Sequence, residues 1–241
     1  MSNVVLLTGG SGGIGRAIIE VLVRKYTVVS FDSSKNEFCH PRLNSVIVDI
    51  SREQELLEVL KYLRSTYEMP YALINNAGVS EPYPFAQTPL DTWNRQILVN
   101  LTAPFILSRE FAAYSPSPGF TRKIVNIASV SGMVGMPRYA AYNCSKAGLI
   151  ALTRTLAIEL APDIHTCAIC PGYIRTPMQV AEHSEEKLTA CANENPSKRL
   201  GKPSEIAELV EFILSGKNAY LNGSIITVDG GETSGGMASK K

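Results

Sequence analysis

The sequence predicts an α/β protein in which a parallel β-sheet is covered by helices on both faces. Short apolar runs alternate along the chain with longer segments whose apolar residues recur at helical spacing. Because the short runs are continuously apolar instead of alternating with polar residues, they are typical of parallel strands buried on both faces. Strands and helices that alternate in this way indicate βαβ units.

The first half of the chain contains four strand candidates, each of which ends at a polar or glycine-rich turn. They are residues 4–7, which stop at a glycine cluster; 27–31, ended by Asp32; 45–48, ended by Asp49; and 72–74, which lead into Asn75-Asn76-Ala77-Gly78. Residues 14–23, 53–63 and 100–114 have the apolar periodicity of helices.

The second half continues the alternation. The strand candidates are residues 123–128, followed by a loop with two glycines, and 165–169, which run into Pro171-Gly172. Residues 139–160 have the pattern of a long, largely apolar helix, which we expect to be covered on several sides. Residues 204–214 are amphipathic, and a turn at Asn222-Gly223 precedes the last strand candidate at 224–228.

Length and composition indicate one globular domain. The chain has 241 residues, of which 45% are hydrophobic and 19% charged. Without an internal repeat or linker pattern, we expect one domain at residues 1–231 and a mobile Gly/Ser/Lys-rich tail at 232–241. A net charge of +1 does not indicate binding to nucleic acid or to an anionic membrane surface.

The cysteines and the hydropathy bear on the cellular setting. The five cysteines are an odd number without a compact framework, which argues against a disulfide scaffold. We find neither the pattern of a secretory signal nor an apolar run of the ~18 residues expected for a membrane span. We therefore expect a reducing, cytoplasmic setting.

A glycine-rich segment, Thr8-Gly9-Gly10-Ser11-Gly12-Gly13-Ile14-Gly15, joins the first strand to the first helix. Glycines there let the backbone approach a pyrophosphate, and the helix N-terminus presents free N–H groups to it. Gly10, Gly12 and Gly15 match the G-x-G-x-x-G fingerprint of dinucleotide binding. A plain strand–helix turn is the alternative interpretation. No Lys-Ser/Thr pair follows, which disfavours a P-loop.

Asp32 ends the second strand, 17 residues beyond Gly15. A carboxylate there can bind the adenosine ribose hydroxyls of NAD(H), and it would repel the 2′-phosphate of NADP(H). The alternative is a solvated turn residue at a strand end. Because Lys35 is the only nearby cation, we expect NAD(H) to be favoured over NADP(H).

Tyr142 and Lys146 lie four residues apart, on one face of the long apolar helix. A free tyrosine, with a pKa near 10, is a poor base at neutral pH, and a nearby ammonium lowers that pKa. Hydride chemistry needs a group that gives a proton to a carbonyl oxygen or takes it back. Without further context, most Tyr/Lys pairs at this spacing are surface neighbours.

Two other polar residues supply context. Ser129 lies 13 residues before Tyr142 at the end of a strand candidate, and the carboxyl ends of strands are where open α/β sheets bind ligands. Its hydroxyl could hold a substrate oxygen beside the phenol. Asn100 lies inside a helical pattern, where asparagine is slightly unfavourable, which hints at a duty other than structure.

Taken together, these residues make the sequence similar to short-chain dehydrogenases/reductases over essentially its whole length. The motifs that carry the resemblance follow one another in family order: Gly9, Gly13 and Gly15 in the spacing T-G-x-x-x-G-x-G, then Asp32, Asp49-Ile50, Asn75-Asn76-Ala77-Gly78, Asn100, Ser129, Tyr142, Lys146 and Pro171-Gly172. The resemblance implies a single-domain Rossmann fold, with a seven-stranded parallel sheet and three helices on each face.

The resemblance also implies a role for each matching residue. Tyr142 would be the acid/base, Ser129 would orient the substrate oxygen, and Lys146 would lower the Tyr142 pKa and bind the nicotinamide ribose. Asn100 is similar to the family asparagine that holds a water in a proton relay. The implied cofactor-binding residues are Gly9, Ser11, Gly12, Gly13, Ile14, Asp32, Asp49, Ile50, Asn76, Ala77, Gly78, Tyr142, Lys146, Pro171, Gly172, Ile174 and Thr176. We expect the substrate near Ser129, Met136, Tyr139, Tyr142 and Tyr173.

We predict no metal site, and packing as the role of Cys144. His165, Cys167 and Cys170 fall in a strand candidate, where residues three apart point to opposite faces.

Residues 173–199 follow the Pro-Gly turn and form either a substrate lid or an ordinary surface helix and loop. The helices at 100–114 and 139–160 resemble those that form the interface of family tetramers, so we expect a homotetramer or homodimer.

The sequence thus predicts an oxidoreductase that transfers a hydride between NAD(H) and a secondary alcohol or ketone. A 3-oxoacyl thioester is one candidate substrate, although carrier-protein reductases usually prefer NADPH, which Asp32 argues against. A sugar, polyol or steroid-like alcohol is the alternative. A non-catalytic dinucleotide-binding sensor on the same fold is disfavoured, because the Ser, Tyr and Lys residues are all present.

Overall fold

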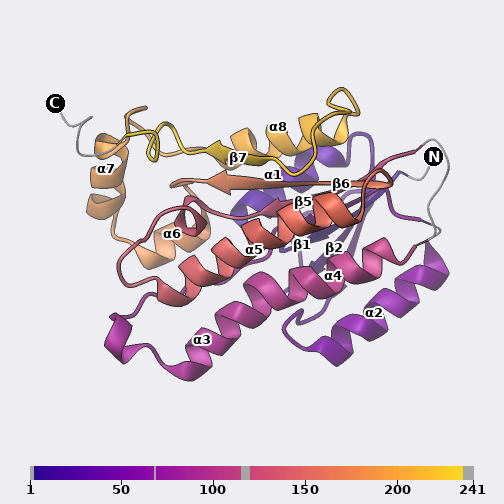
Figure 1. Cartoon of the computed structure of the whole chain (residues 1–241), viewed down its shortest axis with the longest axis horizontal. Coiled ribbons are helices and arrows are strands. Elements are labelled where there is room, and N and C mark those ends of the chain that lie inside the picture. Colours follow the sequence, from indigo (N-terminus) through magenta and orange to yellow (C-terminus); the bar gives the residue numbers. More distant parts are fainter. Residues whose placement is uncertain (1–2, 68, 115–119, 236–241) are drawn as a thin grey trace.

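A seven-stranded parallel sheet forms the centre of the protein (Figure 1). The computed structural model describes residues 3–67, 69–114 and 120–235. The strands lie in the order β3-β2-β1-β4-β5-β6-β7. Their bounds are β1 Val4–Thr8, β2 Thr27–Asp32, β3 Leu43–Ile47, β4 Ala72–Asn75, β5 Arg122–Ile127, β6 Ile164–Pro171 and β7 Ile225–Val228. The order reverses between β1 and β4, so ligands are expected at the carboxyl ends of these strands.

Helices cover both faces of this sheet. Figure 1 shows α1 and α8 on one face, and α2, α4 and α5 on the other. Their bounds are α1 Gly13–Leu22, α2 Glu53–Thr66, α4 Ala103–Ala112, α5 Ala140–Glu159 and α8 Pro203–Leu214. The described chain also contains α3 Leu90–Ile97, α6 Pro177–Glu182 and α7 Glu185–Glu194, and short 3-10 helices at Phe85–Gln87 and Val130–Gly132. The predicted α/β class and the parallel sheet are confirmed.

Each face of the sheet has its own apolar core. On one face, Ile18 and Leu22 of α1 pack with Ile206 and Val210 of α8 against the central strands. Fully burying such a side chain contributes about 1.5–3 kcal/mol. On the other face, α2 and α4 meet over β1 and β4, where Phe111 is buried. These two cores hold the ends of the strands rigidly in place.

The implied count of three helices on each face is wrong on the side of α1 and α8. The connection from β2 to β3, residues 33–42, contains no helix. Asn36 donates a hydrogen bond to the Gly10 carbonyl at 3.2 Å, and the Arg16 guanidinium lies 4.2 Å from the centre of the Phe38 ring. Phe38 thereby packs against the core beside α1, in the place of a helix.

The predicted helix at 100–114 is the second part of a longer helical run. In the structure α3 continues through one π-helical turn, Leu98–Thr102, into α4. A π turn accommodates one extra residue and is often found at functional sites. Asn100 lies within this turn, which explains why a regular periodicity did not place the start of the run.

The end of the domain is a turn built on Asp229. The Asp229 carboxylate accepts hydrogen bonds from Gly231 N, Thr233 N and Thr233 Oγ1 at 2.7–2.9 Å. Of the tail predicted at 232–241, residues 236–241 lie outside the described part of the chain. No helix within the described ranges is long and apolar enough to cross a membrane.

Candidate active site

A cavity of about 430 Å³ lies at the carboxyl ends of the strands. Its lining residues come from the segments that follow β1 to β6, including Gly9 after β1, Asp32 at the end of β2 and Pro171 at the end of β6. This is the crevice in which doubly wound α/β proteins bind dinucleotides. A cavity of this size suits a small-molecule ligand.

Every residue predicted to bind cofactor or substrate lines this cavity. The set comprises Gly9, Ser11, Gly12, Gly13, Ile14, Asp32, Asp49, Ile50, Asn76, Ala77, Gly78, Ser129, Met136, Tyr139, Tyr142, Lys146, Pro171, Gly172, Tyr173, Ile174 and Thr176. Asn100 alone among the predicted site residues does not line it. The fold therefore brings together residues that lie up to 167 positions apart in the sequence.

Close backbone contacts explain the glycines of the first loop. Gly9 has a φ of +69°, which side chains disfavour, and a Cβ on Gly15 would lie 2.0 Å from the Gly9 carbonyl oxygen. A Cβ on Gly12 would meet only that same oxygen, at 3.7 Å. Gly12 therefore faces open space in the cavity, where a cofactor pyrophosphate could approach the backbone.

The turn after β4 is fastened to the glycine loop. Thr8 Oγ1 accepts hydrogen bonds from the backbone N–H groups of Asn76 and Ala77, at 3.0 and 2.9 Å. The Asn76 side-chain amide donates in return to the carbonyls of Thr8 and Gly9, both at 3.0 Å. These bonds fix two adjacent walls of the cavity relative to each other.

Asp32 organises the rim of the glycine loop. Its Oδ2 accepts hydrogen bonds from the backbone N–H and the hydroxyl of Ser11, at 2.8 and 2.6 Å. The carboxylate therefore lies at the mouth of the loop, where an adenosine ribose would bind. Asp49 has a similar local role after β3, since Ser51 donates to it twice. These hydrogen bonds hold the pKa of the Asp49 carboxyl below its usual value.

Ser129, Tyr142 and Lys146 meet behind the end of β5. Both Ser129 and Tyr142 line the cavity, and hydrogen bonding with the Ser129 side chain opposes the rise in the Tyr142 pKa that burial causes. Lys146 Nζ donates to the Ile127 carbonyl at 2.9 Å and lies 5.7 Å from the centre of the Tyr142 ring. Because Tyr142 and Lys146 lie one helical turn apart on α5, a single rigid element sets their separation.

Burial dominates the proton affinities of these groups. It raises the pKa of Tyr142 to about 12, although the hydrogen bond from Ser129 lowers it. Burial also lowers the pKa of Lys146 to about 8. The causes of this shift are burial, Ser129, Glu182 and Tyr139, so the expected lowering of the Tyr142 pKa by Lys146 is not among them. Tyr142 is a protonated phenol at neutral pH, ready to act as an acid.

Asn100 supports the site from behind. Its side chain is fully buried and clamps the backbone of Val79: Oδ1 accepts from Val79 N at 2.8 Å, and Nδ2 donates to Val79 O at 2.9 Å. A third bond joins Nδ2 to Ser145 Oγ on α5 at 3.1 Å. With its amide occupied in this way, Asn100 connects the turn after β4 to the helix of Tyr142. The implied water-holding role stays a prediction.

The cavity also contains polar residues that the sequence did not single out. They are Ser80, Arg95, Gln179, Glu182 and His183. Arg95 pairs with Glu81 at 2.6 Å. Gln179 and Glu182 lie on α6, three residues apart, and so on one face of that helix. Their only signal in the sequence was this spacing within the segment predicted as a lid.

Residues 173–201, which carry α6 and α7, form an excursion from the end of β6 that returns beside its own start. Gly201 N donates to the Tyr173 carbonyl at 2.9 Å, and Arg175 N donates to the Gly201 carbonyl at 3.0 Å. Both ends of the excursion are therefore fixed next to each other, just after the end of β6. Whether it closes over a ligand stays a prediction.

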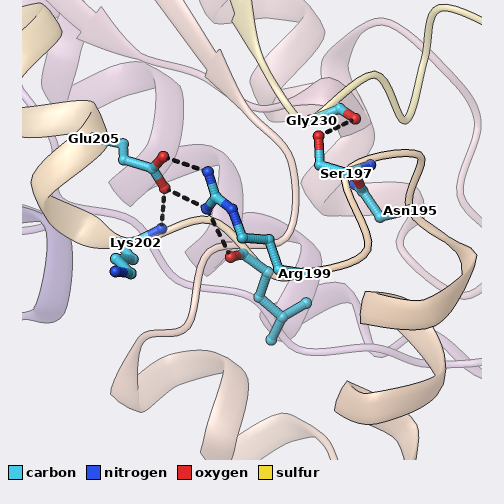
Figure 2. A network of polar contacts seen from close by, with 7 residues as sticks. Asn195, Ser197, Arg199, Lys202, Glu205 and Gly230 are labelled. Carbon is cyan, nitrogen blue, oxygen red and sulfur yellow. Dashed lines mark hydrogen bonds and ion pairs between the residues drawn. The ribbon is translucent and has the colours of Figure 1, made fainter.

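Figure 2 shows how the returning end is anchored. Arg199 makes two parallel bonds to Glu205, at 2.8 and 2.7 Å, and Glu205 also accepts from Lys202 N at 2.7 Å. These bonds lower the pKa of the Glu205 carboxyl to about 2. Ser197 Oγ donates to the Gly230 carbonyl at 2.8 Å. The network joins the excursion to the start of α8 and to the turn after β7.

Comparisons with known proteins agree with this geometry. A family model described as enoyl-(acyl carrier protein) reductase matches residues 12–233. The acetoacetyl-CoA reductase of Shinella zoogloeoides is 34% identical over 239 residues, which cover 96% of this chain and 99% of that protein. The 3-oxoacyl-[acyl-carrier-protein] reductase FabG of Thermotoga maritima is 31% identical over 240 residues, covering 95% and 97%.

A third relative is an uncharacterized short-chain type dehydrogenase/reductase of Sinorhizobium fredii. It is 35% identical over 241 residues, which cover 95% of this chain but only 43% of that protein's length. Together these matches show that the chain belongs to the short-chain dehydrogenase/reductase family, as predicted.

Solved structures show the same fold. The ligand-free aldohexose dehydrogenase of Thermoplasma acidophilum has a TM-score of 0.91 and 28% identity, and covers 100% of this chain and 97% of that one. A 4-hydroxyisoleucine dehydrogenase complexed with NADH also has a TM-score of 0.91, with 31% identity and coverage of 98% and 100%. The family and these likenesses support an oxidoreductase with a nicotinamide dinucleotide cofactor.

Proposed function

We propose that this protein is an NAD(H)-dependent dehydrogenase/reductase that transfers a hydride between the nicotinamide and the carbon of a secondary alcohol or ketone. The observation that carries the proposal is that Ser129, Tyr142 and Lys146 line the same cavity as Asp32 and the glycine loop, with Lys146 Nζ 5.7 Å from the centre of the Tyr142 ring. The residues present suit a dinucleotide, because open glycine backbone, a ribose-binding carboxylate and the acid/base group lie along one cavity.

The glycine loop, Asp32 and Lys146 would hold a nicotinamide dinucleotide, whose chemistry there would be to supply or accept the hydride. Ser129 holds the substrate oxygen next to the Tyr142 hydroxyl. In the direction of reduction, Tyr142 donates its proton to that oxygen, and a pKa of about 12 keeps the phenol protonated until then. In the direction of oxidation, Tyr142 must first lose its proton, which the positive charge of Lys146 and of an oxidised nicotinamide would favour.

The choice of NAD(H) over NADP(H) rests on Asp32. Its carboxylate already accepts two hydrogen bonds from Ser11, so it is held at the position where the ribose hydroxyls would bind. A 2′-phosphate at that position would meet a negative charge at close range. The NADH complex of the 4-hydroxyisoleucine dehydrogenase supports the same preference.

Two classes of substrate have support. The names of the acetoacetyl-CoA and 3-oxoacyl-[acyl-carrier-protein] reductases support a 3-oxoacyl thioester. The likeness to an aldohexose dehydrogenase supports a sugar, a polyol or another hydroxylated alcohol. We also propose a cytoplasmic enzyme, supported by five free cysteines, and a homotetramer or homodimer formed through α4 and α5.

The first experiment measures initial rates of acetoacetyl-thioester reduction with NADH and with NADPH, for the wild type and for Tyr142→Phe. Loss of the phenolic proton should lower kcat by about 10²–10⁴-fold, the usual contribution of general acid catalysis, while NADH binding by fluorescence titration is retained. Undiminished turnover by Tyr142→Phe would refute the mechanism. If the wild type reduces the thioester with NADPH alone, the cofactor preference is wrong. If it reduces the thioester with neither cofactor, the search moves to cyclic and sugar alcohols with NAD.

A further inference from the structure

Glu182 is a carboxylate at the substrate end of the cavity that takes no part in the proposed hydride chemistry. It lines the cavity and is partly buried, at the end of α6. The Tyr139 hydroxyl donates to its Oε2 at 3.4 Å, and the Ser80 side chain lies near the carboxylate. Its other oxygen, Oε1, is buried and has no hydrogen-bond partner among the described residues.

Gln179 presents a second acceptor of the same kind. It lies one helical turn before Glu182 on α6 and also lines the cavity. Its Oε1 is buried and likewise has no partner within the described ranges. A buried acceptor left unpaired is unfavourable, so two of them on one helix face call for donors. In an enzyme cavity, the substrate can supply those donors.

The salt bridges of the described residues leave the Glu182 carboxylate without an ion-pair partner. The two arginines of this segment pair with other carboxylates, Arg175 with Glu185 at 2.9 Å and Arg199 with Glu205 at 2.7 Å. Tyr139, Tyr142 and Tyr173 are phenols whose pKa burial raises, and both His183 and the hydrogen bond from Tyr139 favour the ionised Glu182 carboxylate. Burial raises the pKa of Glu182.

Tyr139 contacts both Glu182 and Tyr142, the proposed acid/base group. Its hydroxyl meets the carboxylate, and its ring packs edge-on to the Tyr142 ring with the centroids 6.4 Å apart. Glu182 thus lies one aromatic ring away from the proposed acid/base group. A substrate whose oxygen bonds Ser129 and Tyr142 would reach Glu182 with a group a few bonds from its reacting carbon.

We propose that Glu182, together with Gln179, recognises a hydrogen-bond donor on the substrate, a hydroxyl or ammonium group near the reacting carbinol carbon. Because it rests on the proposed alcohol/ketone chemistry, this inference narrows the substrate class to alcohols with a neighbouring donor. Glu182 acts here in specificity and takes no part in proton transfer. An apolar group at this position would leave both acceptors unpaired, and a carboxylate would be repelled.

Three nearly isosteric alcohols test the inference: 2-butanol, 1,2-propanediol and 1-amino-2-propanol. They share the reacting CH(OH) carbon and differ only in the terminal CH₃, OH or NH₃⁺ group. We expect the wild type to have at least about tenfold higher kcat/KM with NAD⁺ for one donor-bearing alcohol than for 2-butanol, since a buried polar site rejects analogues that lack the donor.

Variants of Glu182 separate the two kinds of donor. Glu182→Gln keeps an acceptor oxygen but loses the charge, so it should lower kcat/KM for 1-amino-2-propanol by about tenfold while changing 1,2-propanediol much less. Glu182→Leu should abolish the preference for both over 2-butanol. Glu186→Gln removes an exposed carboxylate on the neighbouring α7 and should leave the wild-type ratios unchanged.

Binding of the same three alcohols, measured by calorimetry with and without NADH, separates this inference from the proposed function. If the wild type turns over no alcohol but binds the donor-bearing ones more tightly in a Glu182-dependent way, hydride transfer fails and the recognition stands. If turnover occurs but Glu182→Leu leaves every preference unchanged, the recognition by Glu182 is refuted and the proposed chemistry stands. Equal binding of all three alcohols by the wild type also overturns the inference.

Discussion

The charge and the position of the Asp32 carboxylate are expected to make the enzyme discriminate between NADH and NADPH. It holds Ser11 by two hydrogen bonds and lines the cavity at the end of β2. In Asp32→Ala, the repulsion of a 2′-phosphate and the acceptor for the ribose hydroxyls are both lost. We expect the ratio of kcat/KM for NADH to that for NADPH to fall by about tenfold or more, or about 1.4 kcal/mol per tenfold.

Because Asp32 also supports the glycine loop, its removal should weaken the binding of both NADH and NADPH. The informative quantity is therefore the ratio of the two kcat/KM values. Asp32→Asn keeps the size of the side chain and removes only its charge, so it should shift the ratio in the same direction. Glu37→Ala, an exposed carboxylate in the next connection, is the matched control. A ratio that stays at the wild-type value in both Asp32 variants would rule out Asp32 as the selector.

Individual residues differ in how far the sequence could place them. Tyr142 and Lys146 share one helix, so their spacing alone predicted that they would lie side by side. Ser129 ends a strand, and the parallel sheet brings strand ends to one edge. Glu182 could not be predicted as a neighbour of Tyr139, because nothing in the sequence says in which direction the excursion after β6 folds. Only the tertiary structure brings these two side chains together.

At the scale of elements, the loop between β1 and α1 provides a matched pair of glycines. In Gly15→Ala, the new Cβ would lie 2.0 Å from the Gly9 carbonyl oxygen, so the backbone must shift. Overpacking of this kind costs about 1–3 kcal/mol, which for a protein of this size lowers Tm by roughly 2–12 °C. In Gly12→Ala, the Cβ meets only one atom, at 3.7 Å, and Tm should stay near the wild-type value.

The two variants should differ in cofactor binding as well. The methyl group of Gly12→Ala projects into the space proposed for the pyrophosphate, so KM for NADH should rise while the fold is retained. Thermal unfolding by circular dichroism and NADH titration on the same samples measure both effects. If Gly12→Ala binds NADH as tightly as the wild type, the pyrophosphate does not lie against this loop.

The elements themselves were largely predictable, and the exceptions have physical causes. Apolar or β-branched runs located all seven strands, and the runs are purest in the inner strands, because strands buried on both faces leave little room for polar residues. The connection from β2 to β3 lacks the helix implied by the family resemblance, and Phe38 covers that part of α1 instead. The π turn at Leu98–Thr102 escaped a search based on a period of 3.6 residues, since it inserts a residue into that period.

At the scale of the whole molecule, the outer surface of the helical layer formed by α4 and α5 retains large apolar side chains. Phe105 on α4 is 47% exposed, and Ile158 near the end of α5 is 81% exposed. Single exposed apolar residues are common, but these lie on the two helices that the family resemblance assigns to a subunit interface. Apolar periodicity could not separate the two roles of α5, because burial against the sheet and burial against a partner produce the same pattern.

We expect Phe105→Glu combined with Ile158→Glu to convert the assembly to a smaller species. Two charges placed in an interface would have to be buried unpaired, and such burial is strongly unfavourable. Light scattering after size exclusion, at several protein concentrations, measures the mass of wild type and variant. Tyr62→Glu, which changes an aromatic residue that is 64% exposed on α2, is the control and should keep the wild-type mass. A wild type that is monomeric at all concentrations contradicts the proposed oligomer. A double variant that keeps the wild-type mass would place the interface on another face of the molecule.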